Sequence, residues 1–140
     1  MSRNDFAFSH RFRVRYMEVD PQMVVFNARV LDYVDIVLGE FWRSRGVTFV
    51  GLESFEVHVV RAAIEYLKPM RFDEEIDGLM RVARFGSSSM TTLAEFHGQG
   101  AEDVRARVEL VQVHVDLATG RPLKIPGDIR SRLADPNTEA

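Results

Sequence analysis

The chain has 140 residues, of which 46% are hydrophobic and 28% are charged, a size and balance typical of one globular domain over residues 1–140 with a buried core. The formal net charge of −3 gives no reason to expect a nucleic acid or an anionic membrane as partner, and the absence of cysteine excludes a disulfide scaffold, a thiolate nucleophile and a cysteine metal site. No window approaches the ~18 apolar residues of a membrane span and the N-terminus lacks the apolar segment of a secretory signal, so we expect a cytoplasmic protein.

A strand is predicted at residues 6–16, where the character of the side chain changes with every residue. Arg11, Arg13 and Arg15 fall on one side of this segment. The other side carries Phe6, Phe8, His10, Phe12, Val14 and Tyr16. A period of two indicates a strand with one buried face. We interpret the arginine row as solvent-exposed, with phosphate binding as the alternative.

The period changes between Ala28 and Arg45, where apolar residues recur three or four positions apart. This stripe contains Val30, Leu31, Val34, Val37, Leu38, Phe41 and Trp42. The spacing predicts an amphipathic helix of about 18 residues, or roughly 27 Å at 1.5 Å per residue. Asn27 is suited to cap its first turn, and Gly46 is suited to end it.

Four further strands are predicted after this helix. They span residues 55–67, 75–85, 89–97 and 104–117, and the glycine and serines of FGSSS favour a turn between the second and third of them. One face of the first of these strands is predicted to hold His58, Val60, Ala62, Ile64 and Tyr66. The tail from residue 125 favours one short helical turn followed by frayed terminal residues.

This order of elements predicts an α+β fold. A single long helix needs a wide apolar surface, and five antiparallel strands that curl around it would supply one. The layout is that of the hot-dog fold, one long helix wrapped by a five-stranded antiparallel sheet. Such a sheet keeps an open edge and an uncovered face, so we expect a homo-oligomer, either a dimer or a dimer of dimers that forms a homotetramer.

Asp20 stands in the loop between the first strand and the helix, before Pro21 and the apolar run from Met23 to Phe26. The first turn of a helix offers unpaired N–H groups that can polarise a carbonyl oxygen. A carboxylate held opposite that oxygen can attack the carbonyl carbon or deprotonate a water molecule. These groups suffice to hydrolyse an ester or thioester without Ser, Cys or metal. The alternative is that Asp20 only forms a turn.

The segment VRYMEVDPQMVVFNARVLDYVD, residues 14–35, resembles the signature of the 4-hydroxybenzoyl-CoA thioesterase family of hot-dog proteins, which includes acyl-CoA thioesterases associated with the Tol–Pal system. The similarity continues through AAIEYLKPMRFDEEI, RVARFGSSSMT and ELVQVHVDLATGRPLKIP, and covers roughly residues 8–130. The resemblance implies an acyl-CoA thioesterase that requires no cofactor and has its pocket between two subunits.

The resemblance also implies a role for each matching residue. Asp20 corresponds to the catalytic carboxylate, described as nucleophile or general base, and Asn27 corresponds to the position whose backbone N–H faces the thioester carbonyl. The run that lines the acyl end of the pocket corresponds to Val24, Val25 and Phe26. A turn near the CoA arm corresponds to Arg84, Ser87, Ser88 and Ser89. No metal ligand is implied.

The chain departs from the family pattern at Met23, where relatives often have glycine, and by having neither His nor Tyr in VVFN, residues 24–27. A non-catalytic acyl or acyl-CoA binding module on the same fold is therefore the alternative to an enzyme. A hot-dog dehydratase ranks third, because such enzymes pair a carboxylate with a histidine and the loop-to-helix segment contains no histidine.

Other polar residues have both a structural and a functional interpretation. We expect Glu18 to be a solvated loop charge, with a working carboxylate pair with Asp20 as the alternative. Asp35 is placed favourably near the helix start, with substrate contact as the alternative. For His114 and Asp116, two positions apart, structural roles are expected in preference to metal binding. Candidate partners for the CoA phosphates are Arg81, Arg84, Arg105, Arg107 and Lys124.

Overall fold

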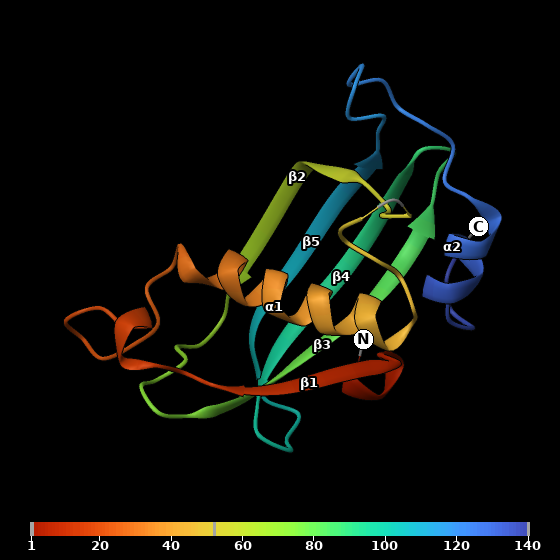
Figure 1. The fold of residues 1–140 in the computed structure, drawn as a ribbon. Coiled ribbons are helices and arrows are strands. Elements are labelled where there is room, and N and C mark those ends of the chain that lie inside the picture. Colours follow the sequence, from red (N-terminus) through yellow and green to blue (C-terminus); the bar gives the residue numbers. More distant parts are fainter. Residues whose placement is uncertain (1, 52, 140) are drawn as a thin grey trace.

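The computed structural model of the protein describes residues 2–51 and 53–139. The chain forms a strand, a long helix, four strands and a short helix, in the predicted order (Figure 1). The strands are β1 (Phe8–Arg13), β2 (Val57–Tyr66), β3 (Glu75–Phe85), β4 (Ser89–Gly98) and β5 (Val104–His114). The helices are α1 (Arg29–Ser44) and α2 (Gly127–Leu133), and short 3-10 turns cover Arg3–Asp5 and Tyr16–Glu18.

The strands form one five-stranded antiparallel sheet in the order β1-β3-β4-β5-β2. α1 crosses one face of this sheet and packs against β1 and β3, which confirms the predicted α+β hot-dog fold (Figure 1). β1 and β2 are the two edges of the sheet. Within the described residues, neither helix combines the length and the hydropathy that a membrane crossing requires.

The core lies between α1 and the sheet. The helix contributes Val30, Tyr33, Val34, Val37, Leu38, Phe41 and Trp42. The predicted stripe is confirmed except at Leu31, which is exposed, and it missed Tyr33, which is fully buried. α1 approaches the sheet closely because Gly78 of β3 lies against Val37, where a Cβ atom on Gly78 would clash with the valine side chain.

α1 begins one residue later than predicted, and the prediction that Asn27 caps it is wrong. Ala28 occupies the N-cap position with near-helical dihedral angles, φ −67° and ψ −20°. The chain therefore turns before the helix starts, and the N–H groups of Arg29 and Val30 donate to the carbonyl groups of the two residues before Ala28. These bonds satisfy the first helical donors without a side-chain cap. Gly46 follows the helix as predicted, with a φ of +70°.

β1 is shorter than predicted, because the chain leaves the sheet after Arg13 and enters a 3-10 turn at Tyr16. Tyr16 is consequently 72% exposed, although the alternation placed it with the buried residues. The arginine row is exposed as predicted, but each of its side chains forms an ion pair, which argues against the phosphate-binding alternative. The pairs are Arg11–Asp77, Arg13–Glu75 and Arg15–Glu18.

β2 does not present the predicted face. The pairing register with β5 shifts between Val59 and Arg61, which marks a bulge. His58 pairs with Val113 and Ala62 pairs with Leu110, three positions apart on β5, so these two residues of β2 lie on opposite faces of the sheet.

The C-terminal residues are bonded to the sheet, contrary to the expectation that they fray. The Glu139 N–H donates to the Ala83 carbonyl and the Phe85 N–H donates to the Glu139 carbonyl, each at 2.9 Å. Asp135 forms a buried ion pair with Arg81 at 3.1 Å. This segment therefore continues the edge of the sheet along the part of β3 that β1 does not cover.

Candidate active site

The loop between β1 and α1 is a compact hairpin. The Asp20 N–H donates to the Val24 carbonyl at 2.9 Å, and Val19 forms a β-bridge with Val25. The second arm of the hairpin is held by the segment before β3, since the Val25 N–H donates to the Met70 carbonyl at 2.8 Å. These hydrogen bonds fix Asp20 and the apolar segment from Met23 to Phe26 within the same hairpin.

The Asp20 side chain is half-buried, and its Oδ1 accepts the Gln22 N–H at 2.8 Å. This bond is the turn-forming interaction that aspartate commonly makes in loops. Across residues 2–51 and 53–139, Oδ2 of Asp20 has no hydrogen-bond partner. The same carboxylate therefore closes the turn with one oxygen and leaves the other available.

Met23 has a φ of +63°, in the left-handed region that favours glycine. Its conformation accounts for the glycine that resembling proteins often carry here. The Met23 carbonyl accepts the Phe72 N–H at 3.0 Å, so this conformation is held by the segment before β3. The loop thus keeps a glycine-type turn but adds an exposed side chain to it.

The N–H of Asn27 donates no hydrogen bond within the described part of the chain and is a free donor directly ahead of α1. The Asn27 carbonyl accepts the Val30 N–H at 3.3 Å and the Tyr66 hydroxyl at 2.9 Å. A cavity of about 260 Å³ adjoins this point. It is lined by Val25, Val30, Tyr66, Leu67, Lys68, Pro69, Met70, Arg105 and Ala106, and not by Asp20.

The cavity includes residues that sequence reasoning did not place at the site. Tyr66 ends β2, and Lys68 and Met70 follow it in the chain, about 40 residues after the loop they adjoin. No local motif marks these residues. The signal that locates them is the sheet order, which sets the end of β2 beside the start of α1 (Figure 1).

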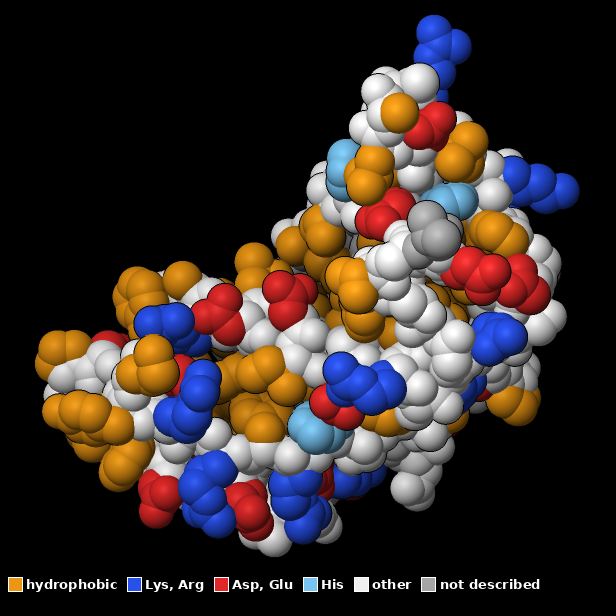
Figure 2. All heavy atoms as spheres, in the orientation of Figure 1, with side chains coloured by type: hydrophobic (Ala, Val, Ile, Leu, Met, Phe, Trp, Pro, Cys, Tyr) orange, Lys and Arg blue, Asp and Glu red, His pale blue; other side chains and the backbone are white. Residues whose placement is uncertain are grey.

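The apolar run is only partly covered. Val24 and Val25 are half-buried, and Phe26 is 49% exposed. Figure 2 shows hydrophobic side chains gathered at the end of the molecule that carries this loop. The exposed set comprises Tyr16, Met17, Met23, Phe26 and Phe72. A surface of this kind is suited to contact an apolar ligand or another protein chain.

Glu18 is 4% exposed, so the expectation of a solvated loop charge is wrong. It forms an ion pair with Arg15 at 2.7 Å and accepts the Tyr33 hydroxyl at 2.9 Å. Burial would raise the pKa of Glu18, but the hydrogen bonds from Arg15 and Tyr33 lower it below its ordinary value. Because both of its oxygens are engaged, Glu18 does not act as the second half of a working pair with Asp20.

Asp35 lies on the exposed side of α1, next to the exposed Ile36 and one turn after the exposed Leu31. Burial, followed by the negative charge of Asp32, raises the pKa of Asp35. Its position makes it available to a ligand or a second chain that contacts the outer side of the helix.

Arg84 and the three serines lie at the opposite end of β3 from the Asp20 loop. Val24 of the loop forms a β-bridge with Arg71, just before β3 begins, whereas Arg84 is the penultimate residue of that strand. At about 3.4 Å per residue, β3 separates the two places by roughly 30 Å. One protomer therefore does not bring these two groups of predicted residues together.

A shallow cavity of about 620 Å³ adjoins the β3–β4 turn. Its lining is Phe85, Gly86, Ser87, Lys124, Ile125, Gly127 and Arg130. Three of the arginines considered for phosphate binding are engaged by carboxylates, in the pairs Arg81–Asp135, Arg105–Glu74 and Arg107–Glu95. Arg84 and Lys124 form no ion pair among the residues that the structure describes. Arg130, which sequence reasoning missed, donates to the Ser87 carbonyl at 2.9 Å.

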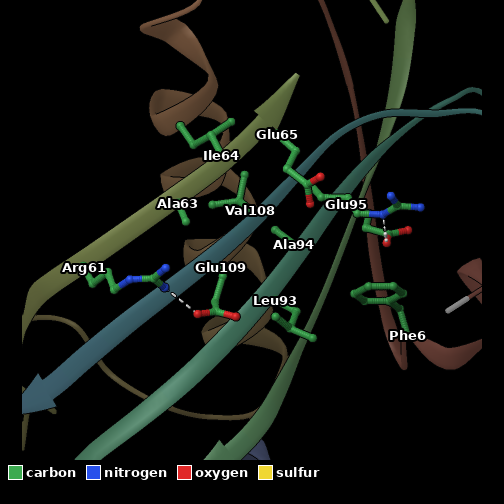
Figure 3. Close-up of a pocket in the computed structure, with 11 residues that line it drawn as sticks. Phe6, Arg61, Ala63, Ile64, Glu65, Leu93, Ala94, Glu95, Val108 and Glu109 are labelled. Atoms are coloured by element: carbon green, nitrogen blue, oxygen red, sulfur yellow. Dashed lines mark hydrogen bonds and ion pairs between the residues drawn. The ribbon is translucent and has the colours of Figure 1, made fainter. Parts of the chain in front are cut away.

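Another cavity, of about 330 Å³, lies on the face of the sheet away from α1 (Figure 3). Arg61 pairs with Glu109 and Arg107 pairs with Glu95 along its wall. Most of its charge is therefore compensated locally. No residue of the Asp20 loop lines it, so we assign it no part in the chemistry discussed here.

His114 has a structural contact, since its Nδ1 lies 2.7 Å from the Glu56 carbonyl oxygen. Within the described ranges, no three His, Asp or Glu side chains are grouped so as to hold a metal ion. The hydrogen-bond contact with Glu56 gives His114 a structural role.

Residues 14–133 match the family model of the thioesterase-like superfamily. The chain belongs to the thioesterase-like superfamily. Membership confirms the resemblance to hot-dog thioesterases, because the match includes the whole Asp20 loop, α1 and the four strands β2 to β5. A solved structure from Pseudomonas aeruginosa strain PAO1 is 25% identical, with a TM-score of 0.83 over 94% of this chain and 92% of that one.

Two other solved structures with names that refer to coenzyme A are similar to this chain. A thioesterase from Thermus thermophilus, complexed with coenzyme A and Zn, is 27% identical, with a TM-score of 0.78 over 93% of this chain and 99% of that one. A 1,4-dihydroxy-2-naphthoyl-CoA thioesterase from Synechocystis has a TM-score of 0.83 at 14% identity, over 93% of this chain and 97% of that one. The second comparison supports the fold alone.

Proposed function

We propose that this member of the superfamily is an acyl-CoA thioesterase, which hydrolyses an acyl-CoA to a free acid and CoA. The observation that carries the proposal is the free N–H of Asn27, directly ahead of α1 and in the same short loop as the Asp20 carboxylate. A donor in that place is suited to the negative charge that develops on the thioester oxygen. The carboxylate is suited to the attack on the thioester carbon.

Two forms of the reaction fit these groups. In the first, an Asp20 oxygen bonds to the carbonyl carbon, the C–S bond breaks, and CoA leaves as a thiolate that takes a proton from water. Water then hydrolyses the mixed anhydride and restores the carboxylate. In the second, Asp20 takes a proton from a water molecule whose oxygen bonds to the carbonyl carbon, the C–S bond breaks, and the proton passes to the departing CoA thiolate. Both forms use the Asn27 N–H to hold the carbonyl oxygen, and Val24, Val25 and Phe26 to contact the acyl group.

The proposal assigns the CoA phosphates to the β3–β4 turn of a second copy of the chain. Cations and hydroxyl groups suited to phosphate gather there: Arg84, Ser87, Ser88 and Ser89 lie at the turn, and Lys124 and Arg130 line the cavity beside it. Because β3 separates the turn from Asp20 by roughly 30 Å in one protomer, a complete site requires a homo-oligomer. A dimer and a dimer of dimers both meet this requirement.

The open edge of β2 is the place where we propose that the second copy pairs. On that side, β2 has no neighbouring strand within the described residues. Val60 is 61% exposed there, and Val59 is also exposed. An unpaired, apolar edge of this kind favours association with another strand.

A non-catalytic acyl-CoA binding module is the second candidate function. Two observations favour it: Oδ1 of Asp20 is already bonded to the Gln22 N–H, and the side chain of Met23 adds bulk to a turn that is often glycine in relatives. Such a module would bind acyl-CoA in the same place without breaking the thioester bond.

A panel of short-chain, long-chain and aromatic acyl-CoA thioesters, assayed by release of free thiol, distinguishes the two candidates. We expect turnover of at least one class, and we expect Asp20→Asn to reduce it by at least ~10² without altering oligomer size or CoA binding. Asp5→Asn is the matched control, because exposed Asp5 also accepts a nearby backbone N–H, that of Ser2. Binding without thiol release would favour the module, and undiminished turnover by Asp20→Asn would end the assignment.

A further inference from the structure

Glu18 and Tyr33 form a buried polar contact next to the Asp20 loop. The Tyr33 hydroxyl, on α1, donates to Oε1 of Glu18 at 2.9 Å, and both side chains are buried. Arg15 completes the contact, since its backbone N–H donates to Oε1 and its Nε donates to Oε2, each at 2.8 Å. Both oxygens of the buried carboxylate are therefore bonded.

Glu18 also holds the loop through its main chain. Its carbonyl accepts the Phe26 N–H at 2.9 Å, and Phe26 directly precedes Asn27. The next residue, Val19, bridges to Val25 on the other arm of the hairpin. The side chain of Glu18 is thus bonded to α1, while its backbone is bonded to the arm that leads to Asn27.

Stability alone does not require this contact. The desolvation of a buried carboxylate offsets much of its attraction to donors, and an apolar pair of similar size often stabilises a core as well or better. The other buried residues of α1 are apolar except Trp42, whose Nε1 has no partner in the described residues. The hydrogen bond between Tyr33 and Glu18 therefore lies near the N-terminal end of α1, where the Asp20 loop enters the helix. Directional bonds there fix an orientation that apolar packing leaves free.

We propose that Glu18 and Tyr33 are positioning residues for the proposed thioester hydrolysis, and that they hold the loop so that the Asp20 carboxylate and the Asn27 N–H keep a fixed mutual orientation. This inference rests on the proposed function. Both residues act through the loop and touch no reacting atom.

Two substitutions test the pair by kinetics. Tyr33→Phe removes only the hydroxyl, and Glu18→Gln keeps the size of the side chain while it removes the charge. For each variant we expect kcat on the best substrate of the panel to fall at least ~10-fold while KM changes by less than ~2-fold. The matched control is Asp77→Asn. Asp77 is an equally buried carboxylate bonded to Arg11 and Arg3 on the face of the sheet away from α1, so its substitution should lower stability and leave kcat unchanged.

Amide hydrogen exchange gives a second readout that does not depend on activity. The N–H groups of Val25 and Phe26 are both bonded in the folded loop, and in Tyr33→Phe we expect them to exchange at least ~10-fold faster while β4 is unchanged. Unchanged loop exchange in both variants would overturn the inference, as would unchanged kcat. If Tyr33→Phe does not fold by circular dichroism, Glu18→Gln decides the matter. If the wild-type protein releases no thiol from any acyl-CoA, the proposed function fails, and the exchange rates still decide whether the pair holds the loop.

Discussion

The Tyr66 hydroxyl donates to the carbonyl oxygen of Asn27 at 2.9 Å, so the last residue of β2 is bonded to the residue whose N–H we assign to the thioester oxygen. Glu18 holds the preceding residue, Phe26, through a backbone hydrogen bond. Asn27 is therefore fixed from both sides by groups outside its own helix. Because Tyr66 belongs to an edge strand, a second chain that pairs with β2 would also act on this bond.

Removal of the Tyr66 hydroxyl should impair catalysis more than stability. We expect Tyr66→Phe to lower kcat by ~3- to 10-fold, while the free energy of unfolding changes by less than about 1 kcal/mol, the usual contribution of one hydrogen bond. Thiol release and urea unfolding measure the two effects. Tyr16→Phe is the control, because the exposed Tyr16 hydroxyl has no bond to any described residue. Equal kinetics for the two variants would contradict a role for Tyr66.

The left-handed conformation of Met23 predicts an unusual order of stability between two small substitutions. Met23→Gly relieves the steric cost of a positive φ, whereas Met23→Ala retains it. We expect the Gly variant to exceed the Ala variant by about 0.5–1 kcal/mol in the free energy of unfolding, as measured by urea titration. At an ordinary position with negative φ the order is reversed. An Ala variant that is the more stable of the two would show that the loop does not hold this conformation in solution.

Val60→Lys should weaken association between copies of the chain, because it places a charge on the open edge of β2. We expect the wild-type protein to sediment as a dimer or a larger assembly, and the variant to shift towards monomer at the same concentration. Thiol release should fall together with the assembled fraction. Leu117→Lys is the control, since Leu117 is similarly exposed but follows β5 in a turn. A wild-type monomer that is fully active would contradict the shared site.

Lys124→Glu should raise KM for acyl-CoA at least ~10-fold with little change in kcat, because it replaces a cation proposed to contact phosphate. The same acyl group on N-acetylcysteamine, which has no phosphate, should be hydrolysed equally by variant and wild type. Arg43→Glu, on α1, serves as the charge-matched control. An equal rise in KM for both substrates would show that Lys124 does not act through the CoA phosphates.

Acid should destabilise the protein over a pH window set by its ion-paired carboxylates. Burial would raise the pKa of Asp77, but hydrogen bonds from Arg11 and Arg3 hold it well below its ordinary value. The Lys68 ammonium and other donors lower the pKa of Asp103 to about 2. A carboxylate with a lower pKa in the folded state stabilises the fold above its unfolded pKa of about 4 and loses this contribution as pH falls towards the folded value. We therefore expect the free energy of unfolding to decline between about pH 5 and pH 2.

Urea unfolding at a series of pH values measures this decline. Asp77→Asn should cost about 2 kcal/mol at pH 7, because it weakens the charge-assisted hydrogen bonds that Asp77 accepts from Arg11 and Arg3. It should also flatten the dependence on pH, since one of the responsible carboxyl groups is gone. Asp128→Asn, at an exposed position in α2, provides the comparison. A pH dependence in Asp77→Asn as steep as in the wild type would show that Asp77 does not contribute.

Local sequence patterns predicted those parts of the fold that apolar contacts decide. The 3.6-residue period located Val34, Val37 and Leu38 in the core, and all three are buried. Tyr33 was missed and Glu18 was misjudged for one common reason. The burial of each polar group is compensated by a hydrogen bond with the other, fifteen residues away in the chain, and a pattern of single residues does not contain that pairing.

The residues of the candidate site likewise fall into two groups, those that a local sequence segment predicts and those that only the tertiary fold brings to the site. Asp20 and Asn27 were predicted because they lie in one continuous segment, which the resemblance covers. Tyr66 reaches that segment only because β2 occupies the far edge of the sheet, an outcome of strand order. The separation of Arg84 from Asp20 depends on the length and direction of β3, which the sequence motifs do not specify.

The contact between Gly78 and Val37 limits what a single chain can enclose. With no room for even one methyl group between helix and strand at that point, a hydrocarbon tail cannot pass between α1 and β3 there. The outside of α1, past the exposed Leu31 and Ile36, is a route that this contact leaves open to a fatty acyl substrate. The longest acyl tail on that route would be set by the spacing between neighbouring chains. Substitutions at the interface between chains would then change the preferred acyl length without any change to the protein core.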